Sequence, residues 1–370
     1  MKFTCEKNAL VSAISVASRT VAQKSTIPAL EGIYIRAGVK LTLSGYNLET
    51  GITISVEADI QETGACIMPS RLFFDIIRKL PDDTVSISVD ENFKVSIRGG
   101  ISSFSITAMS SEDYPELPEV DSEKGIDLPQ SELKAMIGGT SFAVSENQAR
   151  PIHTGCLFEV ADDSIIVVAV DGYRLALRRW KAEAPIGRTL KFVVPAAALK
   201  EAEKILGDTD ETCTFFLGSK HILFTIGEAT LVCRLLEGEF LDWRRVLPQN
   251  QPIKLAVNVA KMTDSIERVG LIISEKLKSP VRCRFGENTA DFRSVSTIGE
   301  AHDVCQIAGD GQDMEIGFNC RYLLDALRAI PDSECSLELV NGLSPIVMNP
   351  CDGSGRYSYM VLPVRLKAGE

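Results

Sequence analysis

Hydrophobic positions follow one plan that occurs three times along the chain. In each case an apolar strand leads through a proline or a small residue into an amphipathic helix, as in ACIMPSRLFFDIIRKLPD, KFVVPAAALKEAEKILGD and MEIGFNCRYLLDALRAIPD. These helices end at Leu80, Leu206 and Ile330, so the repeats lie 126 and 124 residues apart. Because self-similarity at a fixed spacing decides an architecture, we predict three tandem units of one topology.

A second set of helices opens each third of the chain, in FTCEKNALVSAISVAS, IDLPQSELKAMIGGTSFAVS and IKLAVNVAKMTDSIERVGLIIS. Their apolar residues recur three and four positions apart, which gives each helix one buried face. The complete set of predicted helices is 6–22, 70–80, 129–145, 195–206, 258–274 and 319–330.

Alternating and β-branched segments fill the remainder of each third. VSISVDENFKVSIRGGISSFSITAM is typical, with turn residues between short strands, and it predicts hairpins. Each third is therefore expected to be an α+β unit with two helices packed on antiparallel sheet. The proline-containing segments SSEDYPELPEVD and EGEFLDWRRVLPQNQP read as linkers and divide the chain into domains 1–120, 121–250 and 251–370.

Composition narrows the class of protein. The 370 residues are 45% hydrophobic and 24% charged, and no apolar run is long enough to span a bilayer. The opening MKFTCEKNAL lacks the layout of a secretory signal. The ten cysteines are scattered without a C-x-x-C spacing, which favours small buried residues in a reducing compartment. We expect a cytoplasmic protein.

The usual catalytic motifs are missing from the sequence. It contains no phosphate-binding P-loop, no dinucleotide-binding glycine pattern, no H-E-x-x-H and no G-x-S-x-G. His153, His221 and His302 stand in unrelated contexts, so we predict no metal site and no cofactor. Ser131 and Lys134 match the S-x-x-K pattern of some hydrolases, but Ser131 at a helix start is more simply a capping residue.

Charge is distributed unevenly along the chain. The net charge of −11 argues against a surface that is basic all over, yet the predicted helices carry +4 and the remainder carries −15. This segregation fits a protein that holds phosphates on its helix faces. The alternative is an ordinary solvated face with ion pairs such as Asp264 with Arg268 and Asp325 with Arg328. The basic residues concerned are Lys7, Arg19, Arg71, Arg78, Lys79, Lys134, Lys200, Lys204, Lys261, Arg268, Arg321 and Arg328.

Six segments together resemble one protein family over the full length. They are MKFTCEKNAL, FFDIIRKLP, VDGYRLA, FLDWRRVLP, EIGFNCRYLLDAL and YMVLPVRL, and in this order they look like the beta sliding clamp of the bacterial replicative DNA polymerase. The resemblance implies a non-catalytic processivity factor with the DNA-clamp fold. Two chains would join head to tail into a six-domain ring around duplex DNA, with helices inside and sheets outside. A DNA-binding regulator is the competing class, but we find no helix-turn-helix reader.

The resemblance also implies which residues face DNA. Matching positions are Lys24, Arg71, Arg78, Asn147, Gln148 and Arg150, and the basic helix positions Lys79, Lys200, Lys204, Arg321 and Arg328 are further candidates. Such contacts to phosphates would not read sequence. The loop after Arg150 carries Pro151 and Ile152 where the family has two aromatic residues, which leaves the DNA contact of that loop open.

Partner capture and ring closure complete what the resemblance implies. Clamps hold short peptides of polymerases, the clamp loader and repair proteins in an apolar pocket between the second and third domains. Matching positions are Val170, Gly172, Tyr173, Arg174, Leu175, Arg245, Val246, Leu343, Pro345, Met360, Leu362, Pro363, Val364 and Arg365, with His153 and Leu241 as departures from the usual apolar residue and proline. Phe104 and Ile106 match an interface strand, and Leu271 and Ile272 match an interface helix end.

Overall fold

A strand followed directly by a helix is the unit from which the whole chain is built. The computed structural model describes residues 1–121, 123–273 and 279–366, and these form six α-helices. The helices are α1 (Lys7–Ala17), α2 (Ser70–Lys79), α3 (Gln130–Gly138), α4 (Ala196–Ile205), α5 (Val259–Gly270) and α6 (Cys320–Arg328). The strands that precede them are β1 (Lys2–Glu6), β6 (Gly64–Pro69), β10 (Ile126–Pro129), β14 (Leu190–Pro195), β18 (Ile253–Asn258) and β20 (Gly299–Phe318). Two such units occur in each third, which confirms three tandem α+β domains.

Three of the predicted helices end at least four residues earlier than expected. The helix expected over 129–145 ends at Gly138, because Gly138 and Gly139 weaken helical propensity and the Thr140 hydroxyl donates to the Met136 carbonyl at 2.7 Å. The helix expected over 258–274 ends at Gly270, and residue 274 lies outside the described residues. The first helix ends at Ala17 and continues as a 3-10 turn over Ser18–Thr20.

The chain folds into two compact units whose boundary falls within α3 and α4. The first unit comprises residues 1–134 and 200–235 and holds two antiparallel sheets, with strand orders β5-β1-β7-β8-β9 and β10-β15-β16-β17-β4-β3-β2-β6. The additional strands are β2 (Gly32–Ala37), β3 (Leu41–Tyr46), β4 (Thr50–Val56), β5 (Ala58–Glu62), β7 (Thr84–Val89), β8 (Lys94–Gly99), β9 (Ser102–Thr107), β15 (Thr212–Leu217), β16 (His221–Ile226) and β17 (Ala229–Arg234).

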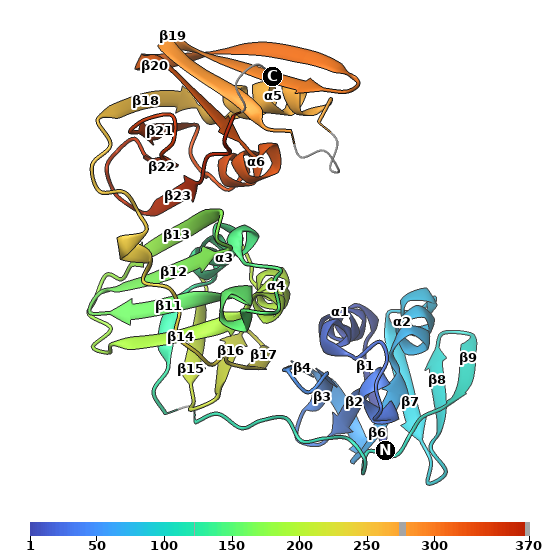
Figure 1. The fold of residues 1–370 in the computed structure, drawn as a ribbon. Helices are drawn as coiled ribbons and strands as arrows, with labels where there is room; N and C mark the ends of the chain where they lie inside the picture. Colours follow the sequence, from blue (N-terminus) through green and yellow to red (C-terminus); the bar gives the residue numbers. More distant parts are fainter. Residues whose placement is uncertain (122, 274–278, 367–370) are drawn as a thin grey trace. The chain divides into compact units, whose positions relative to one another are not determined.

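Helices α1 and α2 pack against each other in the first unit (Figure 1). The apolar stripe expected on α1 is buried together with Phe73, Ile76 and Ile77 of α2. Basic residues fall on the opposite, exposed side of α2. The period of the sequence thus decides which side of each helix remains in water.

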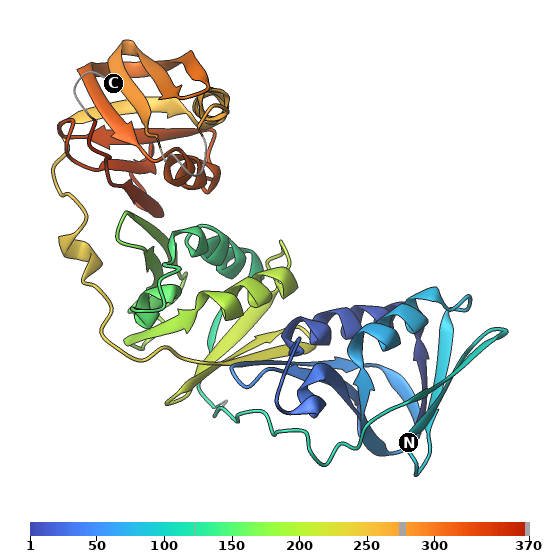
Figure 2. The ribbon, with the colours of Figure 1, turned by 45° about the vertical axis from the view of Figure 1, so that its right-hand side comes forward.

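The second unit comprises residues 135–199 and 236–370 and is built on one ten-stranded sheet, of order β14-β11-β12-β13-β23-β22-β21-β18-β20-β19 (Figure 2). Its further strands are β11 (Gly155–Ala161), β12 (Ser164–Val170), β13 (Arg174–Lys181), β19 (Val281–Ser296), β21 (Glu334–Leu339), β22 (Ile346–Pro350) and β23 (Tyr357–Val361). Strand β13 pairs antiparallel with β23, from Arg174 opposite Val361 to Arg178 opposite Tyr357. Strands near the end of the chain are thereby joined to the central third.

The polar contacts differ from those expected on the helices. Arg268 pairs with Asp303 instead of Asp264, and Arg328 pairs with Glu267 at 2.7 Å. Asp325 lies 2.7 Å from the guanidinium of Arg174 instead of pairing with Arg328. Each of these pairs joins a helix to a neighbouring element instead of linking two residues of one helix.

The S-x-x-K match also finds a plain explanation, though not the expected one. Helix α3 begins at Gln130, so Ser131 is not its capping residue, and its hydroxyl donates to Asp210 at 3.4 Å. Lys134 pairs with Asp208 at 2.8 Å. Within the described ranges, no group of three or more His, Cys, Asp or Glu side chains could hold a metal ion. No helix in the described part of the chain is long and apolar enough to cross a membrane.

Candidate functional site

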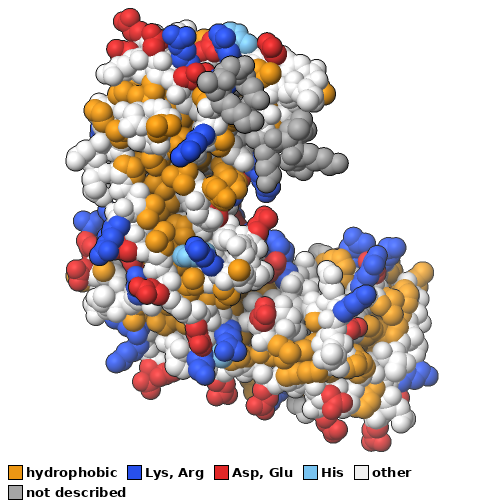
Figure 3. All heavy atoms as spheres, in the orientation of Figure 1, with side chains coloured by type: hydrophobic (Ala, Val, Ile, Leu, Met, Phe, Trp, Pro, Cys, Tyr) orange, Lys and Arg blue, Asp and Glu red, His pale blue; other side chains and the backbone are white. Residues whose placement is uncertain are grey.

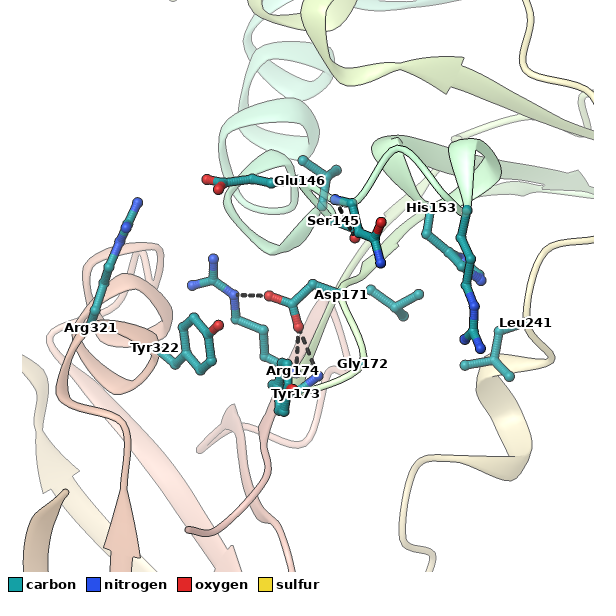
Figure 4. A pocket seen from close by; sticks show the side chains of 14 residues that line it. Ser145, Glu146, His153, Asp171, Gly172, Tyr173, Arg174, Leu241, Arg321 and Tyr322 are labelled. Atoms are coloured by element: carbon teal, nitrogen blue, oxygen red, sulfur yellow. Dashed lines mark hydrogen bonds and ion pairs between the residues drawn. The ribbon is translucent and has the colours of Figure 1, made fainter. Parts of the chain in front are cut away.

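A pocket of about 480 Å³ lies in the second unit, where the turn between β12 and β13 approaches the start of α6 (Figure 4). Its walls come from that turn, from the segment after α3, from the connector that leads to β18, and from α6. The lining residues are Val144, Ser145, Glu146, Asn147, Arg150, His153, Val170, Asp171, Gly172, Tyr173, Arg174, Leu241, Arg321 and Tyr322.

The turn at residues 171–174 is fixed by a single carboxylate. Asp171 Oδ1 accepts hydrogen bonds from the backbone amides of Tyr173 at 2.8 Å and Arg174 at 3.0 Å. Gly172 has a φ of +92°, a conformation that a side chain at this position would strain. The Tyr173 side chain is 61% exposed, and its ring stacks on Tyr322 of α6 with centroids 6.0 Å apart.

Arg174, the first residue of β13, lies beneath this turn, and its side chain is 7% exposed. Its Nε donates to Asp171 at 2.9 Å, its Nη1 to Asp325 of α6 at 2.7 Å and its Nη2 to the carbonyl of Phe142 at 2.6 Å. The rings of Tyr322 and Phe142 lie 4.4 Å and 5.4 Å from its guanidinium carbon. Charge-assisted hydrogen bonds of this kind are roughly twice as strong as neutral ones.

An apolar cluster continues from the pocket beneath the connector. Leu175 and Met360 face each other across β13 and β23 and are buried with Val170, Phe240 and Trp243. Val246 and Leu362 pack against the cluster and remain partly exposed. Figure 3 shows hydrophobic side chains gathered on the visible face of the second unit. Large exposed apolar side chains of this unit include Tyr173, Leu241, Leu343 and Val364.

The connector is held to the sheet by Glu159 of β11. Its carboxylate accepts from the indole nitrogen of Trp243 at 3.3 Å and pairs with Arg244 at 2.8 Å and Lys191 at 3.5 Å. Burial alone would raise the pKa of Glu159, but the hydrogen bonds and charges of these partners, Arg244 above all, lower it. Glu159 is therefore ionised at neutral pH and fixes the segment that carries Leu241 into the pocket.

His153 lies at the side of the pocket, on the 3-10 turn Pro151–Thr154. Its ring meets Phe240 edge to face, with centroids 5.0 Å apart. Its Nδ1 is buried and has no hydrogen-bond partner among the described residues. Burial, followed by the charge of Arg150, lowers the pKa of His153, so the ring is neutral at pH 7.

The structure brings together only part of the predicted pocket set. His153, Val170, Gly172, Tyr173, Arg174 and Leu241 line the pocket. Leu175 and Met360 lie beneath it as core, and Arg245 is exposed beside Asp242 at 3.0 Å. The predicted residues Val246, Leu343, Pro345, Leu362, Pro363, Val364 and Arg365 are partly or largely exposed and do not line it.

Several residues that line the pocket have another predicted role or none. Asn147, Arg150 and Arg321 were predicted to face DNA, yet they line this pocket. Val144, Ser145, Glu146, Asp171 and Tyr322 were not predicted at all. The Asp-Gly turn signal in VDGYRLA could have indicated Asp171, because an aspartate before glycine commonly accepts backbone amides two residues on. No comparable local signal marks Tyr322.

The other predicted DNA-facing residues lie exposed on helices or loops. Arg71, Arg78 and Lys79 share the exposed side of α2, where Figure 3 shows Lys and Arg side chains gathered. Among them, Arg78 pairs with Asp75 at 3.4 Å. Lys24, Gln148, Lys200, Lys204 and Arg328 are exposed as well, with Lys204 2.7 Å from Glu201.

The predicted interface residues lie at the edges of their elements. Strand β9 is the last strand of its sheet, and it carries Phe104, which is 40% exposed, and Ile106, which is half-buried. Leu271 directly follows α5 and is 82% exposed, and Ile272 is half-buried. An open edge with an exposed aromatic side chain invites pairing with another chain.

Comparison with known proteins gives matches along the whole chain. Models of the DNA polymerase III beta subunit match in order, the N-terminal domain over residues 1–118, the central domain over 127–242 and the C-terminal domain over 244–365. The beta sliding clamp of Staphylococcus epidermidis is 33% identical over 381 residues, covering 99% of each chain.

Solved structures agree with these matches. A putative DNA polymerase III beta subunit from Eubacterium rectale has a TM-score of 0.93 and 32% identity, covering 98% of this chain and 99% of its own. The DNA polymerase sliding clamp from Bacillus subtilis has a TM-score of 0.93 and 29% identity, covering 99% of this chain and 100% of its own.

Proposed function

The chain belongs to the DNA polymerase III beta subunit family, and on this premise we propose that it closes into a ring around duplex DNA and tethers the replicative polymerase to it. As a beta sliding clamp it is a non-catalytic processivity subunit. The observation that carries the proposal is the threefold strand-and-helix repeat over the full chain, matched throughout to clamp structures. We propose the cytoplasm as its location, because a processivity subunit acts where the chromosomal DNA lies.

We divide the chain for this role into domains 1–120, 121–250 and 251–370. Two chains joined head to tail would give six domains, because heterologous contacts close into a ring after a whole number of units. The open edge of β9 with Phe104 and Ile106 supports one side of that contact. Leu271 and Ile272 at the end of α5 support the other, since burial in a dimer would remove their apolar surface from water.

The inner face of the ring would hold DNA through helix-borne charge. Arg71, Arg78 and Lys79 on α2 support this role because all three are exposed on one helix. Further candidates are Lys24, Asn147, Gln148, Arg150, Lys200, Lys204, Arg321 and Arg328. Contacts to phosphates carry no sequence information, which suits a ring that must slide over any sequence.

Partner proteins would bind through short peptides at the pocket of the second unit. The pocket combines exposed apolar side chains at Tyr173 and Leu241 with polar groups at its rim, which is the usual composition of a peptide-anchoring site. The remaining predicted residues, including Leu362 and Val364, would extend the contact along the neighbouring apolar surface. Polymerases, the clamp loader and repair proteins would then compete for one site.

Topology on DNA tests this function directly. The protein is loaded by a clamp loader onto a nicked circular plasmid, the plasmid is linearised, and the bound fraction is followed by gel filtration at high salt. We expect retention on circles and loss from linear ends, because a ring slides off an end while salt strips only electrostatic contacts. Equal, salt-sensitive loss from both, with a control clamp loaded in parallel, would contradict the ring.

A further inference from the structure

We infer that Arg174 is a positioning residue of the pocket: it ties the 171–174 turn to α6 and sets the width of the pocket without itself contacting the bound peptide. The inference rests on the proposed peptide-binding function. It changes the role that family resemblance gives to Arg174, which was included among the residues that meet the peptide. It also assigns a role to Asp325, which does not line the pocket.

The guanidinium of Arg174 already donates to acceptors within the protein. An arginine offers five N–H donors in a planar fork. In Arg174 the nitrogens Nε, Nη1 and Nη2 each donate to a different acceptor at 2.6–2.9 Å. Its two aromatic neighbours, Phe142 and Tyr322, add ring contacts, and the side chain is 7% exposed. Two further N–H donors remain, but with the side chain 7% exposed a peptide carboxylate has little access to them.

The two aspartates that Arg174 binds belong to two elements that wall the pocket. Asp171 belongs to the turn that presents Gly172 and Tyr173, and Asp325 lies one helical turn after Arg321 on α6. The bonds from Arg174 to both aspartates therefore connect the turn with the helix. Figure 4 shows Arg174 between the turn and α6, with the Tyr322 ring beside it.

A buried ion pair such as this one contributes more to geometry than to stability. Taking such charges out of water offsets much of their attraction, so the pair adds little stability over a well-packed apolar substitute, while the loss of one partner is costly. The hydrogen bonds of the pair depend on direction, so they hold the 171–174 turn and α6 in one arrangement. Tyr173 and Tyr322 stack above it, and their spacing of 6.0 Å depends on that arrangement.

Substitution of Asp325 separates positioning from contact. The probe is a fluorescent, uncharged ten-residue peptide with leucine and phenylalanine anchors, and a peptide with serine at the anchors is its control. We expect D325A to weaken binding by about tenfold, equivalent to about 1.4 kcal/mol. R174A should weaken it similarly, and the double variant should bind within about twofold of R174A, because both changes break one connection. Binding by D325A equal to wild type would overturn the inference.

Matched controls come from an exposed pair of the same unit. Arg284 and Asp313 lie 3.2 Å apart with side chains 58% and 71% exposed, and neither lines the pocket. R284A and D313A should bind the peptide as the wild type does. If D325A fails to fold, D325N keeps an acceptor for Nη1 without the charge, and its affinity should fall between wild type and R174A. Wild-type affinity in a folded D325N with R174A impaired would assign Arg174 to direct contact.

Hydrogen–deuterium exchange gives a readout that needs no peptide. In D325A, amides of residues 171–174 should exchange faster than in D313A, because the turn has lost its tie to α6. Unchanged exchange there would contradict positioning even if binding were lost. If the wild type itself ignores the anchored peptide while the turn loosens as expected, the proposed peptide site fails and the positioning role stands.

Discussion

Arginine stands in two contrasting environments in this molecule, on the exposed side of α2 and at the start of β13. Arg78 of α2 is 56% exposed and has Asp75 as an ion-pair partner at 3.4 Å, while Arg174 is 7% exposed and donates to three acceptors. The first side chain keeps its charge available to a phosphate. The second has its charge neutralised and supplies geometry instead. Exposure, and not residue type, decides which purpose an arginine serves.

The largest expected difference between the two arginines is the effect of their substitution on the free energy of unfolding. R174A leaves Asp171 and Asp325 without their shared cation, and we expect the free energy of unfolding of the second unit to fall by about 3 kcal/mol. R78A removes an exposed pair and should change the free energy of unfolding by less than about 0.5 kcal/mol. Urea unfolding followed by tryptophan fluorescence measures the first, since Trp180 and Trp243 both belong to that unit.

Circular dichroism at matched urea concentrations extends the comparison to Arg78. R174K is an informative companion, because one ammonium cannot reproduce a fork that reaches three acceptors. Equal urea midpoints for R174A and R78A would mean that burial contributes nothing to the role of Arg174. The two regions would then not differ in what their arginines do.

DNA affinity should depend on the exposed cations of α2 and not on Arg174, and we expect this effect to be smaller than the effect on stability. Replacing Arg71, Arg78 and Lys79 by glutamine removes three cations from one exposed helix side, and the slope of log affinity against log salt should decrease by about 2.7 for duplex DNA. Peptide affinity should not change. Fluorescence anisotropy with a labelled duplex at several salt concentrations measures the slope. A control variant, R284A, should leave it unaltered, and an unchanged slope in the triple variant would remove α2 from the DNA face.

Periodicity predicted the helices because each is amphipathic around one buried stripe. It placed helix ends too late where a side chain competes for the backbone groups of the last turn. In α3, the Thr140 hydroxyl donates to the Met136 carbonyl. Sheet pairing between thirds, such as β13 with β23, could not be read from spacing, because strand partners distant in sequence leave no local signal.

The candidate site was predicted less completely than the fold. Tyr173 and Arg174 came from a recognisable segment, but the packing of α6 brings Tyr322 into the pocket and Asp325 to Arg174. Along the helix, Asp325 looked like a partner for Arg328, and only the folded chain offers it Arg174. The role of such a residue depends on a partner far away in the sequence, so a local pattern cannot predict it.

His153 should give the smallest effect and a test of burial acting on a neutral group. Burial, and then Arg150, lower its pKa in the folded chain from the ordinary value of 6.5. As pH falls through 6.5 the unfolded chain therefore takes up a proton before the folded chain does, and the free energy of unfolding decreases until the folded pKa is passed. His153→Leu removes this term, so the difference in urea midpoint between variant and wild type should shift in favour of the variant as pH falls from 8 to about 5.5. Other titrating groups cancel in that difference. A difference that stays constant would mean that His153 accepts a proton in the pocket as readily as in water, and one that favours the wild type in acid would mean that it does so more readily. Either result would contradict a lowering of its pKa by burial.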